Sequence, residues 1–107
     1  MTMFMTNKEA EKWAIEEARR ITRSILKGRD VRTWLFGSRA AGNARSFSDI
    51  DIALDAGAKP VTRELLVRLS CALEESNIPF RVDIVDIHNV SPAVRENIEK
   101  DGQLWTD

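Results

Sequence analysis

Two aspartates separated by one residue, Asp49 and Asp51, are the clearest candidates for chemistry in this sequence. Residues 49–55 alternate carboxylates with aliphatic side chains, which is typical of a strand with one covered face. Side chains two apart on a strand lie about 6–7 Å apart on the same face, and two carboxylates that close repel each other unless a cation lies between them. Mg²⁺ and Mn²⁺ both accept such oxygen ligands. The pair therefore predicts a divalent metal site.

A third aspartate, Asp83, lies on another expected strand over residues 80–87. Val82 and Ile84 should take one face of that strand and Asp83 the other, while Asp86 should fall on the face opposite Asp83. If this strand pairs with residues 49–55, three carboxylates converge, as two-metal phosphoryl transfer requires. The alternative is that the aspartates are only the solvated side of amphipathic strands, although Asp is depleted in strands.

A glycine and a serine directly follow the first expected strand, residues 31–36. Gly37 removes side-chain bulk, so a phosphate can approach the backbone, and Ser38 offers a hydroxyl and an N–H at the start of a helical turn. Arg39 and Arg45 are candidates to neutralise phosphate charge. The turn is not a Walker P-loop, because Asn43 and Ala44 follow Gly42 where Lys and Ser or Thr are required. It is not the dinucleotide-binding fingerprint either, because the glycine spacing is wrong, so this turn alone is a weak signal.

The elements that must position these residues follow from apolar spacing and from helix-boundary signals. Besides the three strands we expect helices over residues 7–27, from Pro60 to residue 76, and from Ser91 to Gly102, with a loop at 46–48. This order predicts an α+β fold in a single domain, residues 1–107, built on a small mixed β-sheet with helices packed on one face. The other face, which carries the carboxylates, is expected to be open.

Composition limits the class of protein. Of the 107 residues 43% are apolar and 31% are charged, as in a globular domain. No apolar stretch approaches the roughly 20 residues that span a bilayer, and residues 1–6 lack the pattern of a secretory signal. Cys71 is the only cysteine, so no intrachain disulfide can form. We therefore expect a cytoplasmic protein that does not associate with membranes.

Charge is distributed unevenly along the chain. Residues 1–45 carry ten Lys and Arg against five Asp and Glu, whereas residues 46–107 carry six against twelve. One interpretation is two solvated surfaces of opposite sign; another is that the basic part meets phosphate or an acidic partner. Direct nucleic-acid binding is not expected. Five basic residues in the second half of the first helix and the connection after it are either its solvated side or a contact for nucleic acid or an acidic partner: Arg19, Arg20, Arg23, Lys27 and Arg29.

The two motifs together are much more specific than either alone. Gly37-Ser38, ten residues and then Asp49-Ile50-Asp51 resemble the GSx10DxD signature of the polymerase-β-like nucleotidyltransferase superfamily. The run GSRAAGNARSFSDIDIAL resembles the minimal nucleotidyltransferases of the MNT family, small antitoxin-type partners of HEPN-domain proteins. The resemblance extends over about residues 31–87, with one departure, since Ala41 stands where the family often has a second arginine.

The resemblance implies roles for particular residues. Gly37 and Ser38 would hold the triphosphate, and Arg39 matches a position near the nucleotide or the partner. The metal ligands would be Asp49, Asp51 and Asp83, and the last of these would also help to deprotonate the acceptor hydroxyl.

Other families that use an Asp-x-Asp pair fit less well. Glycosyltransferase domains are much longer than this chain. Phosphatases of the haloacid-dehalogenase type have Thr or Val two residues after the second aspartate, where this chain has Ala53. Toprim domains need a glutamate on an earlier strand, and residues 31–36 contain none.

The resemblance implies an enzyme that moves AMP from ATP to a hydroxyl of a HEPN-type toxin. Only about 20 residues follow the third strand, too few for the helical domain that helps larger superfamily members to bind the acceptor, which favours a partner protein. Two alternatives stay open: a non-catalytic antitoxin that covers its partner, and a free-standing transferase for a small molecule or an RNA end. The residues do not decide base selectivity, Mg²⁺ against Mn²⁺, or homo- against hetero-oligomer.

Overall fold

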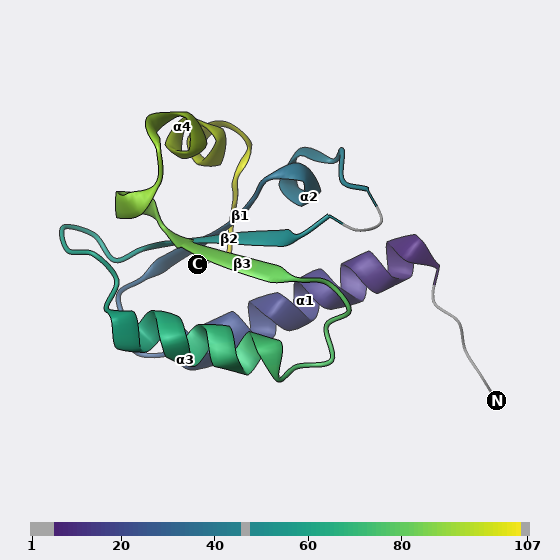
Figure 1. Cartoon of the computed structure of the whole chain (residues 1–107), viewed down its shortest axis with the longest axis horizontal. Helices are drawn as coiled ribbons and strands as arrows, with labels where there is room; N and C mark the ends of the chain where they lie inside the picture. The colour runs from purple at the N-terminus through teal and green to yellow at the C-terminus, as the bar shows by residue number, and fades with distance from the viewer. Residues whose placement is uncertain (1–5, 46–47, 106–107) are drawn as a thin grey trace.

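The computed structural model describes residues 6–45 and 48–105 (Figure 1), so most of the expected loop at 46–48 lies outside the described residues. A mixed four-stranded sheet with helices on both sides confirms the predicted α+β class. The elements in chain order are α1 (Asn7–Leu26), β1 (Arg32–Phe36), α2 (Ser38–Ala41), β2 (Ile50–Asp55), α3 (Arg63–Glu74), β3 (Val82–Asp86), a 3₁₀ turn (Ile87–Asn89), α4 (Pro92–Asp101) and β4 (Gln103–Leu104).

The first helix ends within one residue of its predicted boundary. At its start the Glu9 amide donates to Thr6 Oγ1 and the Thr6 amide donates to Glu9 Oε1, each at 3.1 Å, which completes a capping box. At its end Gly28 has a φ of 79°, a conformation that glycine adopts readily just after a helix. Although α1 has 20 residues, neither it nor any other helix within 6–45 and 48–105 is apolar enough to cross a bilayer.

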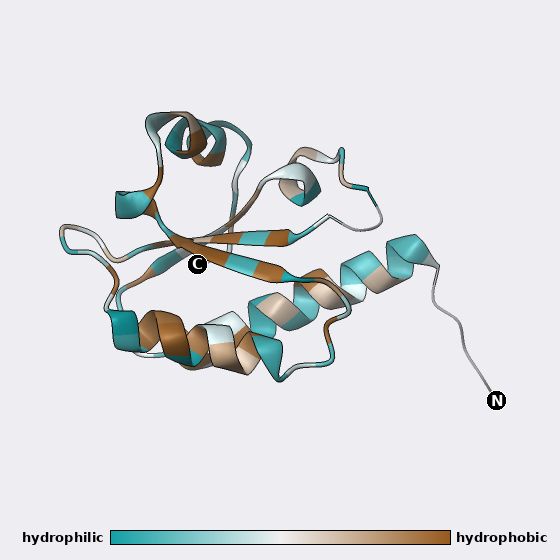
Figure 2. Ribbon diagram, viewed as in Figure 1, coloured by the Kyte–Doolittle hydropathy of each residue, from teal (hydrophilic) through white to brown (hydrophobic). Residues whose placement is uncertain are grey.

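The sheet order is β3-β2-β1-β4. β1 is antiparallel to β2 and to β4, whereas β2 and β3 run parallel with α3 in the connection between them. In Figure 2 strands β2 and β3 alternate apolar and polar segments along their length, as the period-two pattern predicted. β4 was not predicted, because two residues are too short to show an alternation in the sequence.

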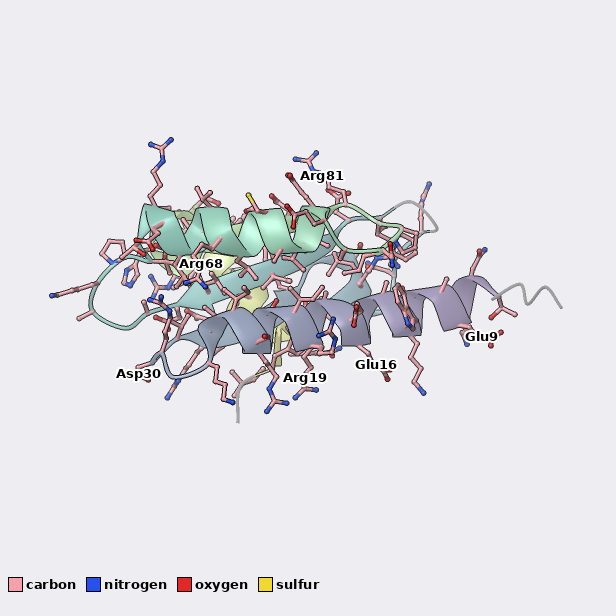
Figure 3. The ribbon with its side chains drawn as sticks, turned by 90° about the horizontal axis from the view of Figure 1, so that it is seen from below. Glu9, Glu16, Arg19, Asp30, Arg68 and Arg81 are labelled. Carbon is pink, nitrogen blue, oxygen red and sulfur yellow. The ribbon has the colours of Figure 1, made fainter. Side chains whose placement is uncertain are left out.

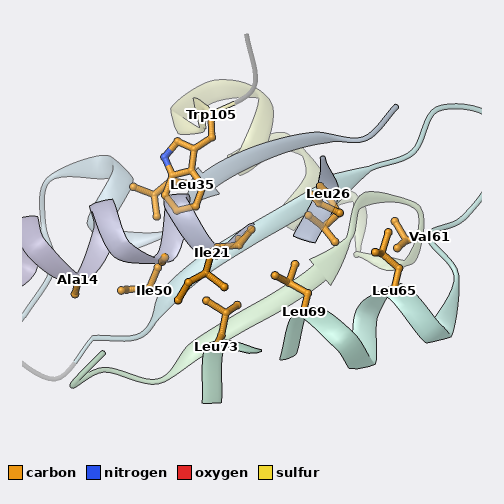
Figure 4. Packing of buried hydrophobic residues seen from close by; sticks show 13 residues of the cluster. Ala14, Ile21, Leu26, Leu35, Ile50, Val61, Leu65, Leu69, Leu73 and Trp105 are labelled. Atoms are coloured by element: carbon orange, nitrogen blue, oxygen red, sulfur yellow. The ribbon is translucent and has the colours of Figure 1, made fainter. Parts of the chain in front are cut away.

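Helices α1 and α3 cover one face of the sheet and enclose the larger core (Figure 4). They lie side by side, as Figure 3 shows from below. The predicted apolar stripe of α1 is largely confirmed, since Ala14, Ala18 and Ile21 are buried. The side chains from the strands and from α3 that close this core are Leu35, Ile50, Ile52, Leu54, Leu65, Leu69 and Leu73, with Trp105 beside Leu35.

The second face of the sheet is not fully open, so that part of the sequence prediction was wrong. α4 and the 3₁₀ turn pack on it and bury a second apolar cluster made of Phe36, Ala53, Ile87 and Ile98. The physical reason is that this face also carries apolar residues, and leaving them in water would forgo the stabilisation that their burial gives. The carboxylates keep only the part of this face that α4 does not cover.

Helix boundaries outside α1 were predicted with mixed success. Ser91 caps α4 by accepting from the Val94 amide at 3.3 Å, with Pro92 as the first helical residue and Gly102 at the end, as expected. α3, however, does not start at Pro60. It starts at Arg63, because the Thr62 side chain caps it by accepting from the Leu65 amide at 3.3 Å.

Asp86 lies on the face of β3 that is opposite Asp83, as predicted, and is only 3% exposed. Its Oδ2 accepts from the Val61 amide at 2.8 Å and its Oδ1 accepts from the His88 amide at 3.0 Å. The carboxylate therefore fastens the segment before α3 to the turn after β3. A buried acid with two amide donors stabilises the fold only while both bonds persist.

Replacing Asp86 by alanine is expected to lower the free energy of unfolding by about 2–3 kcal/mol, because it leaves two amides without their acceptor. Urea unfolding followed by circular dichroism measures the change. The control is Asp101→Ala, at an exposed acid, which should change stability by less than about 0.5 kcal/mol. Equal effects of the two substitutions would contradict the anchoring role.

Candidate active site

Three aspartates lie together at one end of β2 and β3. The parallel register places Asp51 beside Asp83, and Asp49 precedes β2 with the same side-chain direction as Asp51. The pairing of the two strands, on which the convergence of the three acids depended, is therefore present. Both Asp51 and Asp83 are half-buried at the site.

The electrostatics of this group are unfavourable when no cation is bound. Burial, and then the negative charges of Asp83 and Asp49, raise the pKa of Asp51 from 3.8 to about 6, while the positive charge of Arg39 acts in the opposite direction. A perturbed carboxylate in a group of like charges is a feature of sites that bind cations or move protons. The fold thus disfavours the charged form of Asp51.

The raised pKa predicts how stability depends on pH in the absence of metal. The folded protein binds the Asp51 proton more tightly than the unfolded chain, so this group stabilises the fold below about pH 4, and the contribution is lost as pH rises through about 6. Asp51→Asn should therefore raise the free energy of unfolding near neutral pH by about 1 kcal/mol. This is less than the free energy equivalent of the full pKa shift, because solvent screens a half-exposed group. Thermal melts in EDTA across this range test it, and an Asp51→Asn profile parallel to wild type would contradict it.

Gly37 touches the acidic group directly. It follows β1, whose last residue Phe36 pairs with Asp51, and it has φ 76° and ψ −159°, a backbone region that only glycine occupies readily. A Cβ at this position would lie 2.3 Å from Asp51 Oδ2. The sequence suggested that Gly37 makes room for phosphate; the structure adds that it makes room for the Asp51 carboxylate.

Ser38 begins α2, the turn that follows Gly37. As in any first helical turn, its N–H has no acceptor within the helix itself, while Gly37 O accepts from the amides of Ala40 and Ala41 at 3.1 and 3.0 Å. The backbone of this turn thus presents donors next to the carboxylates. Its contact with a triphosphate stays a prediction.

Arg39 is placed differently from what its predicted role suggests. Its side chain is 2% exposed, and its Nε and Nη2 donate to Ser48 O at 3.0 and 2.6 Å. Its Nη1 donates to Glu11 Oε2 at 2.5 Å, and the guanidinium lies 4.2 Å from the centre of the Phe80 ring. We therefore expect Arg39 to act on the site by holding Ser48, the residue before Asp49, rather than by touching a nucleotide.

Replacing Arg39 by alanine is expected to lower the free energy of unfolding by about 3 kcal/mol, because it removes a buried guanidinium and leaves the Ser48 carbonyl without its donors. The change is measured by urea unfolding. Arg68→Ala, at an exposed position of α3, is the matched control and should stay within about 0.5 kcal/mol of wild type. A stable Arg39→Ala protein would mean that the buried contacts are dispensable.

Arg45, the second arginine singled out in the sequence, is exposed. It borders a cavity of about 270 Å³ on the α1 side of the segment after α2, and none of the three aspartates lines that cavity. Arg45 is therefore the arginine that can still approach an anion. The cavity is lined by Asn7, Lys8, Glu11, Arg39, Gly42, Ala44, Arg45 and Phe80.

No motif or periodic pattern in the sequence indicates that the chain after α4 supports this site. The Gln103 side chain donates through Nε2 to Ala40 O of α2 at 3.2 Å. The Trp105 amide donates to Thr33 O at 2.8 Å, and Trp105 O accepts from Arg19 Nη2 at 3.1 Å. β4 thus ties the turn after Gly37 to β1 and α1. Only the three-dimensional arrangement reveals this, since a two-residue strand has no periodic signature.

Within residues 6–45 and 48–105, no three Asp, Glu, His or Cys side chains are gathered into a complete metal-binding group. The donor set nevertheless fits Mg²⁺, which is usually held by one or two carboxylates together with waters and substrate phosphates. A cation would stabilise the charged form of Asp51, whose pKa is raised by burial and by its like-charged neighbours. The residues present therefore fit a metal that arrives with a triphosphate.

Comparison with known families agrees with this arrangement. The sequence model of the family described as Polymerase beta, Nucleotidyltransferase matches residues 21–106. The chain therefore belongs to this nucleotidyltransferase family, and the resemblance seen in the sequence is confirmed.

Individual relatives are more specific. The chain is 39% identical over 71 residues to Probable protein adenylyltransferase MntA of Haemophilus influenzae, which covers 66% of this chain and 61% of that protein. It thus spans less than two thirds of this relative's length. A crystal structure of a toxin–antitoxin complex with AMP-PNP matches 82% of this chain and 72% of that chain, with a TM-score of 0.65 and 25% identity. A solved structure assigned provisionally as a minimal nucleotidyltransferase matches 95% and 98%, with a TM-score of 0.66 and 26% identity.

Proposed function

We propose that this chain is a metal-dependent adenylyltransferase that moves AMP from ATP to a hydroxyl group of a HEPN-type partner protein. The observation that carries the proposal is the grouping of Asp49, Asp51 and Asp83 next to Gly37 at the end of β1, within a nucleotidyltransferase fold. The MntA relative supports protein adenylylation. The AMP-PNP in the similar toxin–antitoxin complex supports ATP as the donor and a toxin as the partner.

In the proposed reaction the acceptor hydroxyl oxygen attacks the α-phosphorus of ATP. A new phosphorus–oxygen bond forms, the bond to the bridging oxygen breaks, and pyrophosphate leaves. A carboxylate accepts the hydroxyl proton, a role that we assign to Asp83. The backbone at Gly37 and Ser38 would orient the triphosphate, so that the α-phosphorus lies in front of the acids.

We assign the metal to Asp49, Asp51 and Asp83, with Mg²⁺ or Mn²⁺ as the ion. When bound, such a cation would offset the repulsion among the carboxylates and stabilise the charge on the attacking and leaving oxygens. Arg39 would keep Asp49 in place through Ser48, and Gln103 would keep the turn after Gly37 in place. The chain's own residues thus supply orientation, proton acceptance and the metal's ligands.

The proposal is tested with purified protein, a HEPN-type partner, Mg²⁺ and ATP labelled either on the α- or on the γ-phosphorus. We expect the partner to take up the α-label but not the γ-label, because the β- and γ-phosphates leave as pyrophosphate. Repeating the assay with GTP, CTP or UTP in place of ATP measures the base selectivity of the transfer. If neither the partner nor a panel of small hydroxyl acceptors gained the α-label with any nucleotide, the proposed activity would be wrong.

Catalysis can be separated from simple covering of the partner with an Asp49→Ala/Asp51→Ala variant. We expect this variant still to bind the partner in size-exclusion chromatography. We also expect that it no longer protects cells in which the partner is expressed. Protection equal to that of wild type would instead favour an antitoxin that works by binding alone.

A further inference from the structure

A second surface with a strong local charge lies at the other end of β1. It is a groove of about 690 Å³ between the C-terminal end of α1, the connection from α1 to β1, and β4. Figure 3 shows Asp30 at this end of the molecule, just beyond the last turn of α1. Of the residues that the structure describes, four basic side chains and one acid, Asp30, line the groove. These four are Arg23, Lys27, Arg29 and Arg32.

Three of these cations are free to meet a partner. Lys27, Arg29 and Arg32 are exposed and, in the part of the chain that the structure describes, their side chains make no hydrogen bond or ion pair. Arg32 is opposite Asp55 in the β1–β2 register, but the two form no ion pair. The partial negative charge at a helix C-terminus explains a lysine at residue 27. It does not explain Arg29 and Arg32, which lie beyond the last turn of the helix.

The groove also has an apolar part. Leu26 and Val31 line it, and so does Leu104 of the edge strand β4, which is 55% exposed. An exposed leucine beside several unpaired cations suits a ligand that combines negative charge with an apolar side chain. A surface that only contacts solvent would need neither the exposed leucine nor the cluster of cations.

The ligand class that these features favour is an acidic protein segment rather than a nucleic acid. The whole chain has a net charge of −1 and a pI of about 5.9, whereas nucleic-acid-binding domains are usually strongly basic. Among the residues that the structure describes, no aromatic side chain lines the groove to stack on a base. A leucine contact has a natural counterpart in a peptide and none in a phosphate backbone.

We propose that this basic groove is a docking surface for an acidic segment of a partner protein, with carboxylates at Lys27, Arg29 and Arg32 and one apolar side chain on Leu104. The groove lies at the start of β1, and Gly37 follows the end of that strand, five residues after Arg32, so the two regions are separated by about 17 Å along the strand. Docking there leaves the aspartates accessible. The inference does not depend on nucleotide transfer.

The test is a titration of the ¹⁵N-labelled protein with a peptide of alternating Glu and Leu blocks, followed by NMR. We expect the amides of Val31, Thr33 and Leu104 to shift and the binding to weaken with salt. The Lys27→Glu/Arg29→Glu/Arg32→Glu variant should bind about tenfold more weakly or worse. Leu104→Ser, which changes no charge, should weaken binding about threefold or more.

The matched control is Lys59→Glu/Arg63→Glu/Arg68→Glu, which changes the net charge equally at exposed residues outside the groove and should bind within about twofold of wild type. Thermal melts check that each variant is folded. If the Lys27→Glu/Arg29→Glu/Arg32→Glu variant is not folded, the milder Arg29→Gln/Arg32→Gln variant replaces it. Equal weakening in groove and control variants, shifts confined to other residues, or tighter binding of a single-stranded RNA of equal length at this groove would overturn the proposal.

Discussion

Asp51→Ala is expected to lower the rate of AMP transfer to the partner by about a thousandfold or more. The substitution removes the carboxylate that lies beside Asp83 in the β2–β3 register, and whose pKa is raised by burial and then by the neighbouring charges. Metal-assisted phosphoryl transfer gains several kcal/mol from charge stabilisation, and each 1.36 kcal/mol changes the rate about tenfold. The measurement is a single-turnover assay with ATP labelled on the α-phosphorus.

Asp55→Asn is the matched control for this variant. Asp55 lies four residues further on the same strand and on the same face, where it accepts from the Gly57 amide at 2.8 Å, but it is not part of the acidic group. We expect this variant to transfer AMP within about threefold of wild type. Mg²⁺ should raise the melting temperature of wild type with ATP present and have little effect on Asp51→Ala. Comparable loss in both variants would show that the effect is not specific to the acidic group.

Gly37→Ala is expected to reduce AMP transfer by about a hundredfold and to lower the free energy of unfolding by about 2–3 kcal/mol. The backbone at φ 76° and ψ −159° is strained for any residue with a Cβ, and the added Cβ would lie 2.3 Å from Asp51 Oδ2. Either the Asp51 carboxylate or the turn must move. A displacement of about 1 Å at a reacting centre can reduce a rate about a hundredfold.

Gly28→Ala separates the effect of backbone strain from the effect of the steric overlap with Asp51. Gly28 also has a positive φ, 79°, but a Cβ there would meet no atom within 4 Å. This variant should lose about 1–2 kcal/mol of stability and keep its transfer rate. The rates are compared at a temperature where both variants are folded. If Gly37→Ala lost stability but transferred AMP as fast as Gly28→Ala does, the contact between Gly37 and Asp51 would have no part in catalysis.

Much of the fold could be predicted because its signals are local. The Thr6–Glu9 capping box, the aliphatic alternation of β2 and the Ser91-Pro92 start of α4 each depend on residues a few positions apart. The same locality made Asp49 and Asp51 visible as a pair. Asp83 could be placed on the correct face of β3, but only the register showed that it lies beside Asp51.

What could not be predicted depends on contacts between distant parts of the chain. Arg39 is buried between Glu11, Ser48 and Phe80, so its contacts join four segments of the chain. From the sequence alone, an arginine after Gly-Ser is equally consistent with a phosphate ligand. The covering of the second sheet face by α4 depends on Ile98 meeting the strands. The sequence favours Pro60 as a helix start because no local signal ranks it below Thr62, whose side chain caps α3.

The parallel pairing of β2 and β3 also has a consequence for how the protein acquires its site. Asp51 and Asp83 are 32 positions apart and become neighbours only when β3 pairs with β2, which requires α3, in the connection between them, to lie on the face of the sheet. Parallel pairing of strands that are distant in the sequence is slow compared with forming a helix or a turn, because the entropy of closing the chain is lost before the new contacts form. The acidic group should therefore appear at the end of folding, together with the core under α3, and partly folded chains should carry the turn after Gly37 without a functioning site.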